Sequence, residues 1–209
     1  MAEVVAPNPE AGSKPAQILA AAGKLFLENG YGAVSMDTVA KTANVSKATL
    51  YAHFRSKDEL FAAMVACECR AQMGDMTCSN IGCMDVTEAL RVIGRRFMQM
   101  LLSPQALSAY RVVVAEAHRF PELARAFYES GPARSLREMA AYLREVDRRG
   151  QLRIPDPELA AEQFFGLLKA HIHTRFILCI EDALPEAEVN RQVDSTVTLF
   201  TRGYAPDAR

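Results

Sequence analysis

The sequence has no large excess of either charge, which excludes a protein that coats nucleic acid over its whole surface. Its 24 Lys and Arg residues against 25 Asp and Glu residues give a formal net charge of −1. Any contact with nucleic acid must therefore be made by a local patch. The most basic segment that can be helical runs from Lys41 to Lys57. It contains Lys47 and Arg55 as well, and no acidic residue.

Long apolar runs are also missing. No stretch reaches the ~18 apolar residues that a transmembrane helix needs, and the run over 164–172 is interrupted by Lys169. The first dozen residues lack the basic region and apolar run of a signal peptide, and we expect residues 1–13 to form a disordered arm. We therefore expect a cytoplasmic protein with no membrane partner, whose five cysteines are reduced thiols.

Signatures of catalysis are absent as well. GxSxG, a Gly-rich phosphate loop and HExxH do not occur, so the sequence predicts neither an enzyme nor a cofactor. No strand pattern is convincing, because apolar residues recur at helical spacing nearly everywhere. We therefore predict an all-α fold of about nine to ten helices. In the later part of the chain the predicted helices run over 85–102, 104–118, 121–130, 133–149, 157–180 and 185–203.

The segment from Ser35 to Lys57, SMDTVAKTANVSKATLYAHFRSK, has the pattern of a helix-turn-helix. Ser35 and Ser46 can each cap a short helix. Asn44 lies between the two helices and tolerates the positive φ that a tight turn requires. Ala40 is small enough for the helices to cross closely. The spacing of four apolar residues predicts that they hold both helices on the core: Val39, Val45, Leu50 and Phe54.

The second short helix of this unit would enter the major groove of DNA by its N-terminal end. Thr49 can hydrogen-bond a base edge, and Ala48 can touch a thymine methyl group. Tyr51, His53 and Lys57 suit phosphates. This set is short and uncharged at its centre, so we expect specificity to depend also on backbone positioning and DNA shape.

The stretches ILAAAGKLFLENGYGAVSMDTVA and ANVSKATLYAHFRSKDEL resemble the DNA-binding domain of the TetR/AcrR family. The stretches RVVVAEAHRFPELARAFYESGPAR and IPDPELAAEQFFGLL are similar, more weakly, to the AefR-like subgroup. The resemblance implies a dimeric repressor whose last two long helices pair into a four-helix bundle, and which leaves a palindromic operator when a ligand binds. It places the DNA contacts at Ser35, Ser46, Lys47, Ala48, Thr49, Tyr51, His53 and Lys57.

We divide the chain into a helix-turn-helix domain over 14–60 and a helical ligand-binding and dimerisation domain over 61–209. Apolar side chains on the expected inner faces of the second domain are candidates for a pocket that takes a small apolar or amphipathic effector. Most of them are expected to be core, and two histidines lie beside them. The candidate pocket residues are Phe97, Met98, Leu101, Tyr110, Val114, His118, Phe127, Met139, Phe164, Leu168 and His171.

The last two long helices carry more apolar surface than one side of a helix normally exposes. Pairing of two copies about a twofold axis would bury this surface, although burial within one subunit is the alternative. The residues that we expect at the dimer interface are Phe165, Ile172, Phe176, Cys179, Val193, Val197 and Phe200.

Two other functions remain open. Cys67, Cys69, Cys78 and Cys83 could form a thiol-redox or soft-metal sensor on DNA, but their spacing, CxCx8Cx4C, matches no usual zinc pattern, so we predict no metal site. Packing of small apolar side chains is the simpler interpretation. A helical adaptor or enzyme is an alternative of another class, which would lack salt-dependent DNA binding.

Overall fold

The computed structural model describes residues 12–73 and 84–206, and these residues form helices α1 to α11 with no strand among them. The predicted all-α fold is confirmed. The chain divides into two compact units. Unit 1 comprises residues 1–71 and 108–132, and unit 2 comprises residues 72–107 and 133–209. Among the described helices, none has the length and apolarity to cross a membrane.

Unit 1 contains the predicted helix-turn-helix. The expected arm over 1–13 lies mostly outside the described residues, but Ser13 accepts a hydrogen bond from Ala16 N–H and caps the first helix. Gly30, with φ of 75°, bends this helix near its end, because only glycine adopts such a φ at little cost. The helices of the unit are α1 (Lys14–Ala33), α2 (Met36–Thr42), α3 (Lys47–His53), α4 (Lys57–Met73), most of α6 (Pro104–Glu116) and α7 (Pro121–Ser130).

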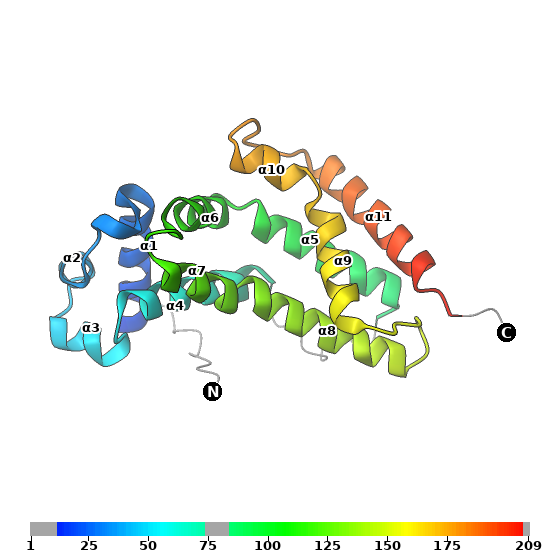
Figure 1. The fold of residues 1–209 in the computed structure, drawn as a ribbon, viewed down its shortest axis with the longest axis horizontal. Helices are drawn as coiled ribbons and strands as arrows, with labels where there is room; N and C mark the ends of the chain where they lie inside the picture. The colour runs from blue at the N-terminus through cyan, green and yellow to red at the C-terminus, as the bar shows by residue number, and fades with distance from the viewer. Residues whose placement is uncertain (1–11, 74–83, 207–209) are drawn as a thin grey trace. The chain divides into compact units, whose positions relative to one another are not determined.

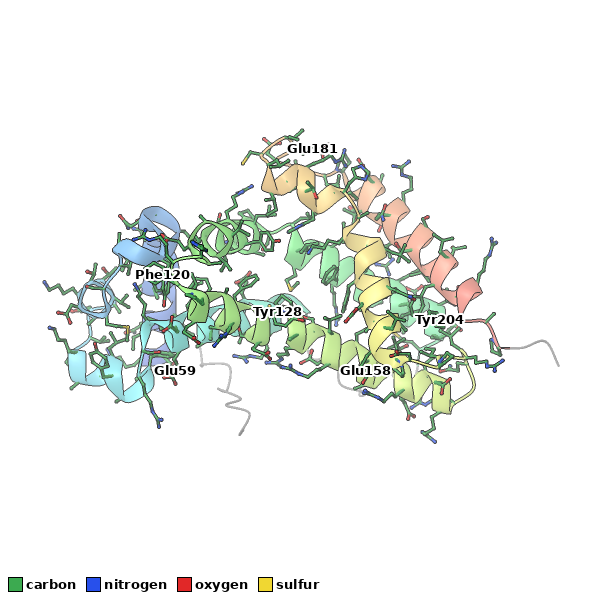
Figure 2. The ribbon with its side chains drawn as sticks, in the orientation of Figure 1. Glu59, Phe120, Tyr128, Glu158, Glu181 and Tyr204 are labelled. Carbon is green, nitrogen blue, oxygen red and sulfur yellow. The ribbon has the colours of Figure 1, made fainter. Side chains whose placement is uncertain are left out.

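Four aromatic rings form the centre of unit 1. Tyr31 contacts Phe26 and Phe61 with centroid distances of 5.3 and 5.7 Å, and Phe120 packs on it at 5.4 Å. Phe120 directly precedes α7 (labelled in Figure 2). This unit therefore extends past the domain boundary expected at residue 60, because the segment that joins α6 to α7 supplies one ring of its core.

Unit 2 is built on three helices in mutual contact. The last helix packs against α5 and α9, as Figure 1 shows. At Gly94 of α5 an added Cβ would lie 3.1 Å from Val193 Cγ1 and 3.4 Å from Leu168 Cδ2, so glycine permits the close crossing. The helices of the unit are α5 (Val86–Leu101), α8 (Pro132–Arg148), α9 (Pro157–Lys169), α10 (Ile172–Ile177) and α11 (Glu186–Gly203).

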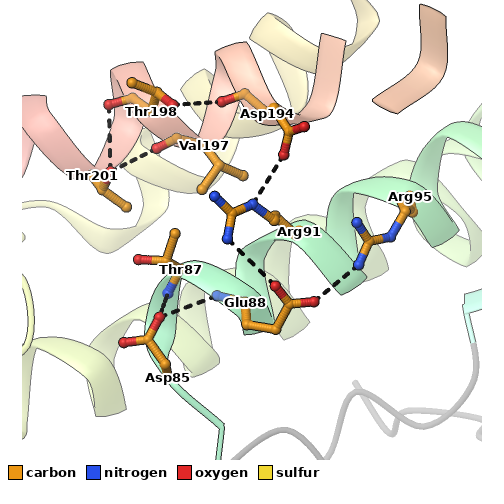
Figure 3. A network of polar contacts seen from close by, with 9 residues as sticks. All are labelled: Asp85, Thr87, Glu88, Arg91, Arg95, Asp194, Val197, Thr198 and Thr201. Atoms are coloured by element: carbon orange, nitrogen blue, oxygen red, sulfur yellow. Dashed lines mark hydrogen bonds and ion pairs between the residues drawn. The ribbon is translucent and has the colours of Figure 1, made fainter. Parts of the chain in front are cut away.

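Polar contacts fasten these helices to one another. Figure 3 shows Arg91 of α5 between Glu88, one turn earlier, and Asp194 of α11, whose carboxylate accepts a hydrogen bond from Arg91 Nε at 3.0 Å. Asp85 caps the start of α5. The side chain of Tyr204, labelled in Figure 2, follows α11 and donates to Gln163 of α9 at 2.7 Å.

The single helix predicted over 157–180 is wrong. The helix is interrupted at Ala170, whose φ of 34° and ψ of −139° lie outside the helical region, and a shorter helix, α10, begins at Ile172. No Gly or Pro stands at the break, so the sequence offers no local signal for it. The adjacent Ile172 and Thr174 are β-branched and weaken helix propensity only slightly.

Candidate nucleic-acid interface

The two short helices of unit 1 begin at the predicted caps. Ser35 Oγ accepts a hydrogen bond from Thr38 N–H at 3.1 Å, and Ser46 Oγ accepts one from Thr49 N–H at 3.0 Å. Each hydroxyl replaces a partner that the first turn of a helix lacks. The positions where α2 and α3 begin are therefore fixed by residues that the sequence already identifies.

The turn between α2 and α3 has the predicted left-handed residue. Asn44 has φ of 51°, and its N–H bonds to Lys41 O at 3.1 Å, while Val45 N–H bonds to Ala40 O at 3.0 Å. Ala40 is buried where the chain reverses. The apolar anchors Val39, Leu50 and Phe54 are buried and Val45 is half-buried, so the outer face of α3 is set by packing of its inner face.

The outer face of α3 carries most of the predicted DNA contacts. Lys47, Ala48, Tyr51 and His53 are exposed, and Tyr51 retains 48% of its accessible surface. Thr49 is less accessible, because it is half-buried and its hydroxyl lies 2.8 Å from Ser46 Oγ. A base contact by Thr49 would therefore compete with, or extend, this bond within the protein.

One acidic residue that the sequence reasoning missed lies against this face. Asp37, in the first turn of α2, holds the Lys47 ammonium with 2.5 Å between Oδ2 and Nζ. The segment between Lys41 and Lys57 contains no acidic residue. The fold, however, brings α3 back beside Asp37, which lies just before that segment in the sequence. The signal available in the sequence was a carboxylate in the first turn of one helix and a cation at the start of the next.

Lys57, a predicted phosphate contact, also makes bonds within the protein that the sequence does not predict. Its ammonium donates to Tyr31 O at 2.8 Å and to Val34 O at 2.9 Å, and burial lowers the pKa of this lysine. An ammonium has three donors, so at most one remains for a phosphate. Next to it, Asp58 accepts a hydrogen bond from the Tyr31 hydroxyl at 2.5 Å, and burial together with this carboxylate raises the pKa of Tyr31.

The residues proposed for an effector pocket are distributed over both units. Tyr110, Val114, His118 and Phe127 belong to unit 1, and the others belong to unit 2. Val114 is 60% exposed, so the prediction that it lies on an inner face is wrong. His118 and His171 are exposed too, because each lies at a helix end or turn. The pocket candidates that are buried within unit 2 are Phe97, Met98, Met139, Phe164 and Leu168, while Leu101 is half-buried.

The residues predicted to face a second copy are mostly not on the surface. Cys179 is exposed, but it lies in the turn after α10 rather than on a long helix. The others pack inside unit 2, where α5 takes up one face of α9 and α11; Phe97, for example, stacks on Phe165 at 4.3 Å. The apolar period therefore marks the core of one subunit at Phe165, Ile172, Phe176, Val193, Val197 and Phe200.

The cysteine cluster is described only in part. Cys67 and Cys69 are half-buried on α4, whereas Cys78 and Cys83 lie outside the described residues. Within the described ranges no three His, Cys, Asp or Glu side chains are grouped to hold a metal ion. The sensor hypothesis thus gains no support from the part of the cluster that can be seen.

A capped helix-turn-helix with an exposed second helix defines a DNA-binding protein, and known proteins identify its kind. Residues 18–64 match the bacterial regulatory proteins of the tetR family. Residues 88–206 match the C-terminal domain of the AefR-like transcriptional repressor. Together the two matches cover more than half of the chain, which therefore belongs to the TetR family of transcriptional regulators. The proteins of this family are DNA-binding regulators rather than enzymes.

Solved structures extend the likeness over nearly the whole chain. The flavonoid-responsive regulator FrrA is 36% identical with a TM-score of 0.78, over 95% of this chain and 100% of that chain. A TetR-family regulator from Mesorhizobium loti MAFF303099 is 30% identical with a TM-score of 0.79, over 94% of this chain and 98% of that chain.

A sequence relative matches a shorter part of the chain. YhgD of Bacillus subtilis strain 168, an HTH-type regulator, is 57% identical over 44 residues, which span 21% of this chain and 23% of YhgD.

Proposed function

We propose that this regulator is a homodimeric repressor that binds a palindromic operator through α3 and leaves it when a small apolar or amphipathic effector binds. The observation that carries the proposal is the division of α3 into two faces. Leu50 fixes the inner face in the core, while Ala48, Tyr51 and His53 stand exposed on the outer face. A short helix anchored in this way fits the major groove and presents side chains to base edges and phosphates.

Dimer formation is supported by a different set of residues from those first predicted. Leu159 and Leu167 of α9 are 47% and 39% exposed, and Leu199 of α11 is 57% exposed. The two leucines of α9 are eight residues apart and therefore lie on one face of the helix. Because α9 and α11 pack against each other, a twofold axis across their outer faces would bury these leucines in both copies.

An apolar or amphipathic effector is supported by the relatives. The AefR-like match covers residues 88–206, and a structure similar over 95% of the chain belongs to a regulator described as flavonoid-responsive. Flavonoids are flat aromatic molecules with polar edges. Aromatic and sulfur-containing side chains such as Phe97, Phe164 and Met139 suit ligands of this kind.

The proposal is tested by recovering bound duplexes from a genomic pool and then adding candidate effectors. We expect an inverted repeat among the recovered sequences, since a symmetric dimer reads two half-sites about one helical turn apart. A panel of flavonoids and fatty acids is then titrated while DNA affinity is followed by fluorescence anisotropy. Operator affinity that no compound lowers would refute effector release and leave the DNA-binding function standing. Recovery of sites without symmetry would refute the dimeric mode of binding.

A further inference from the structure

The ion pair between Asp37 and Lys47 joins the two helices of the helix-turn-helix on its outer side. The oxygen and nitrogen are 2.5 Å apart, although the side chains remain 50% and 62% exposed. Their backbones are held in place by buried residues of each helix, Val39 and Leu50. Because the core already orders the backbone on both sides, the pair costs only the rotamer freedom of its two side chains.

This carboxylate neutralises the main positive charge of α3. The helix reads KATLYAH, so Lys47 is its single Lys or Arg. Affinity for DNA of arbitrary sequence comes almost entirely from cations that displace counterions from phosphates. A cation held by a carboxylate must leave that partner before it can contribute, and the exposed carboxylate left behind then repels the phosphates.

We propose that Asp37 is a specificity-determining residue of the DNA interface, because it withholds Lys47 from the phosphates of arbitrary duplexes. This inference rests on the proposed entry of α3 into the groove. The neighbouring contacts expected from Ala48 and Thr49 are uncharged and do not require Lys47 to be released. Asp37 thus weakens the sequence-independent part of binding, while these contacts to bases are retained. The difference between operator and other DNA increases as a result.

The test is a double-mutant cycle in the full-length protein, with a duplex of random sequence as the probe. Asp37→Asn should steepen the slope of log K against log salt by about 0.9 for each Lys47 that gains a phosphate. It should also raise the affinity at low salt several-fold. Lys47→Gln should leave the slope of the wild-type protein nearly unchanged, but should abolish the gain in the Asp37→Asn background. Asp37→Glu keeps the charge and should keep the wild-type slope.

A matched control separates the local pair from net charge. Glu122 pairs with Arg125 at 3.0 Å on the exposed side of α7, so Glu122→Gln changes the charge equally while α2 and α3 are untouched. This variant should not reproduce the slope of Asp37→Asn. Additive effects of Asp37→Asn and Lys47→Gln would overturn the inference, as would weaker binding of Asp37→Asn to random DNA. Failure of the folded wild-type protein to bind any duplex would instead overturn the DNA-binding function itself.

Discussion

The ammonium of Lys57 lies 4.1 Å from the centre of the Tyr31 ring and donates a hydrogen bond to the carbonyl oxygen of the same residue, 2.8 Å away. The first side chain of α4 therefore holds the turn that follows α1. Phe120 also packs on the Tyr31 ring, and the same ammonium lies 5.7 Å from the centre of the Phe120 ring, so the segment that precedes α7 meets this turn as well. A lysine that the sequence predicts as a phosphate contact thus also ties segments of unit 1 together.

Replacement of Lys57 by Met should destabilise the protein. Two partly buried carbonyl groups would lose their donor, and an unpaired group of this kind costs about 1–3 kcal/mol. Urea unfolding at neutral pH measures the change. Lys24→Met, at an exposed position of α1, is the control and should be close to neutral. Equal stabilities of the two variants would show that the Lys57 bonds contribute nothing in solution.

His173 should make the protein less stable in mild acid. Burial, and to a smaller extent the charge of Lys169, lowers the pKa of this imidazole to about 4 from its usual 6.5. The unfolded chain binds a proton at His173 at a pH where the folded chain does not. Stability is therefore complete above pH 6.5 and falls as the pH drops toward 4, by about 2 kcal/mol between pH 7 and pH 5.

Urea unfolding of the wild type and of His173→Gln over this pH range isolates the effect from the titration of carboxylates. The His173→Gln curve should be flatter than the wild-type curve between pH 7 and pH 5. His171→Gln, at the exposed neighbouring position, should follow the wild type. Parallel curves for wild type and His173→Gln would contradict the assignment.

A charge on the outer face of α11 should separate the dimer without unfolding the subunit. Leu199 is 57% exposed, so Leu199→Glu removes little packing from its own chain but would bury two carboxylates in the paired state. Sedimentation at micromolar concentration should show monomers with a native circular dichroism spectrum. Val114→Glu, at an equally exposed apolar position of α6, should remain dimeric. A dimeric Leu199→Glu protein would place the interface elsewhere.

The close crossing at Gly94 should not accept a methyl group. Val193 is fully buried and β-branched, so it cannot rotate away from a Cβ that would lie 3.1 Å from its Cγ1. We expect Gly94→Ala to cost about 1–2 kcal/mol, since overpacking outweighs the gain in helix propensity. Thermal denaturation tests this against Gly203→Ala, whose added Cβ meets nothing within 4 Å. A more stable Gly94→Ala protein would show that α5 and α11 can move apart.

The features that the sequence predicts correctly are local ones. Ser35 and Ser46 cap their helices within three residues, and Asn44 adopts its positive φ within a single turn. Such features depend on a few neighbouring residues, whatever the rest of the chain does. The exposed face of α3 is predicted correctly for the same reason. The spacing of the apolar anchors along the sequence determines which side of a short helix is buried.

The features that the sequence does not predict are decided by distant residues. Lys57 reaches carbonyl groups 23 and 26 residues away, and the turn at Ala170 has no local signal. For Val193 and Phe200 the apolar period was right, but a period cannot tell whether a face is covered by the same chain or by a second one. In this chain α5 covers part of that face, which leaves the less regular leucines such as Leu199 outside.

The most direct test of the central claim is the affinity of Ala48→Glu for a duplex recovered with the wild-type protein. Ala48 is exposed on α3, so the substitution leaves the core intact but introduces a carboxylate where a groove should fit. Ala115→Glu, at an exposed position of α6, is the matched control. Anisotropy titrations should show at least a hundredfold loss for Ala48→Glu and wild-type affinity for Ala115→Glu. Equal affinities of all three proteins would contradict the assignment of α3 as the helix that reads DNA.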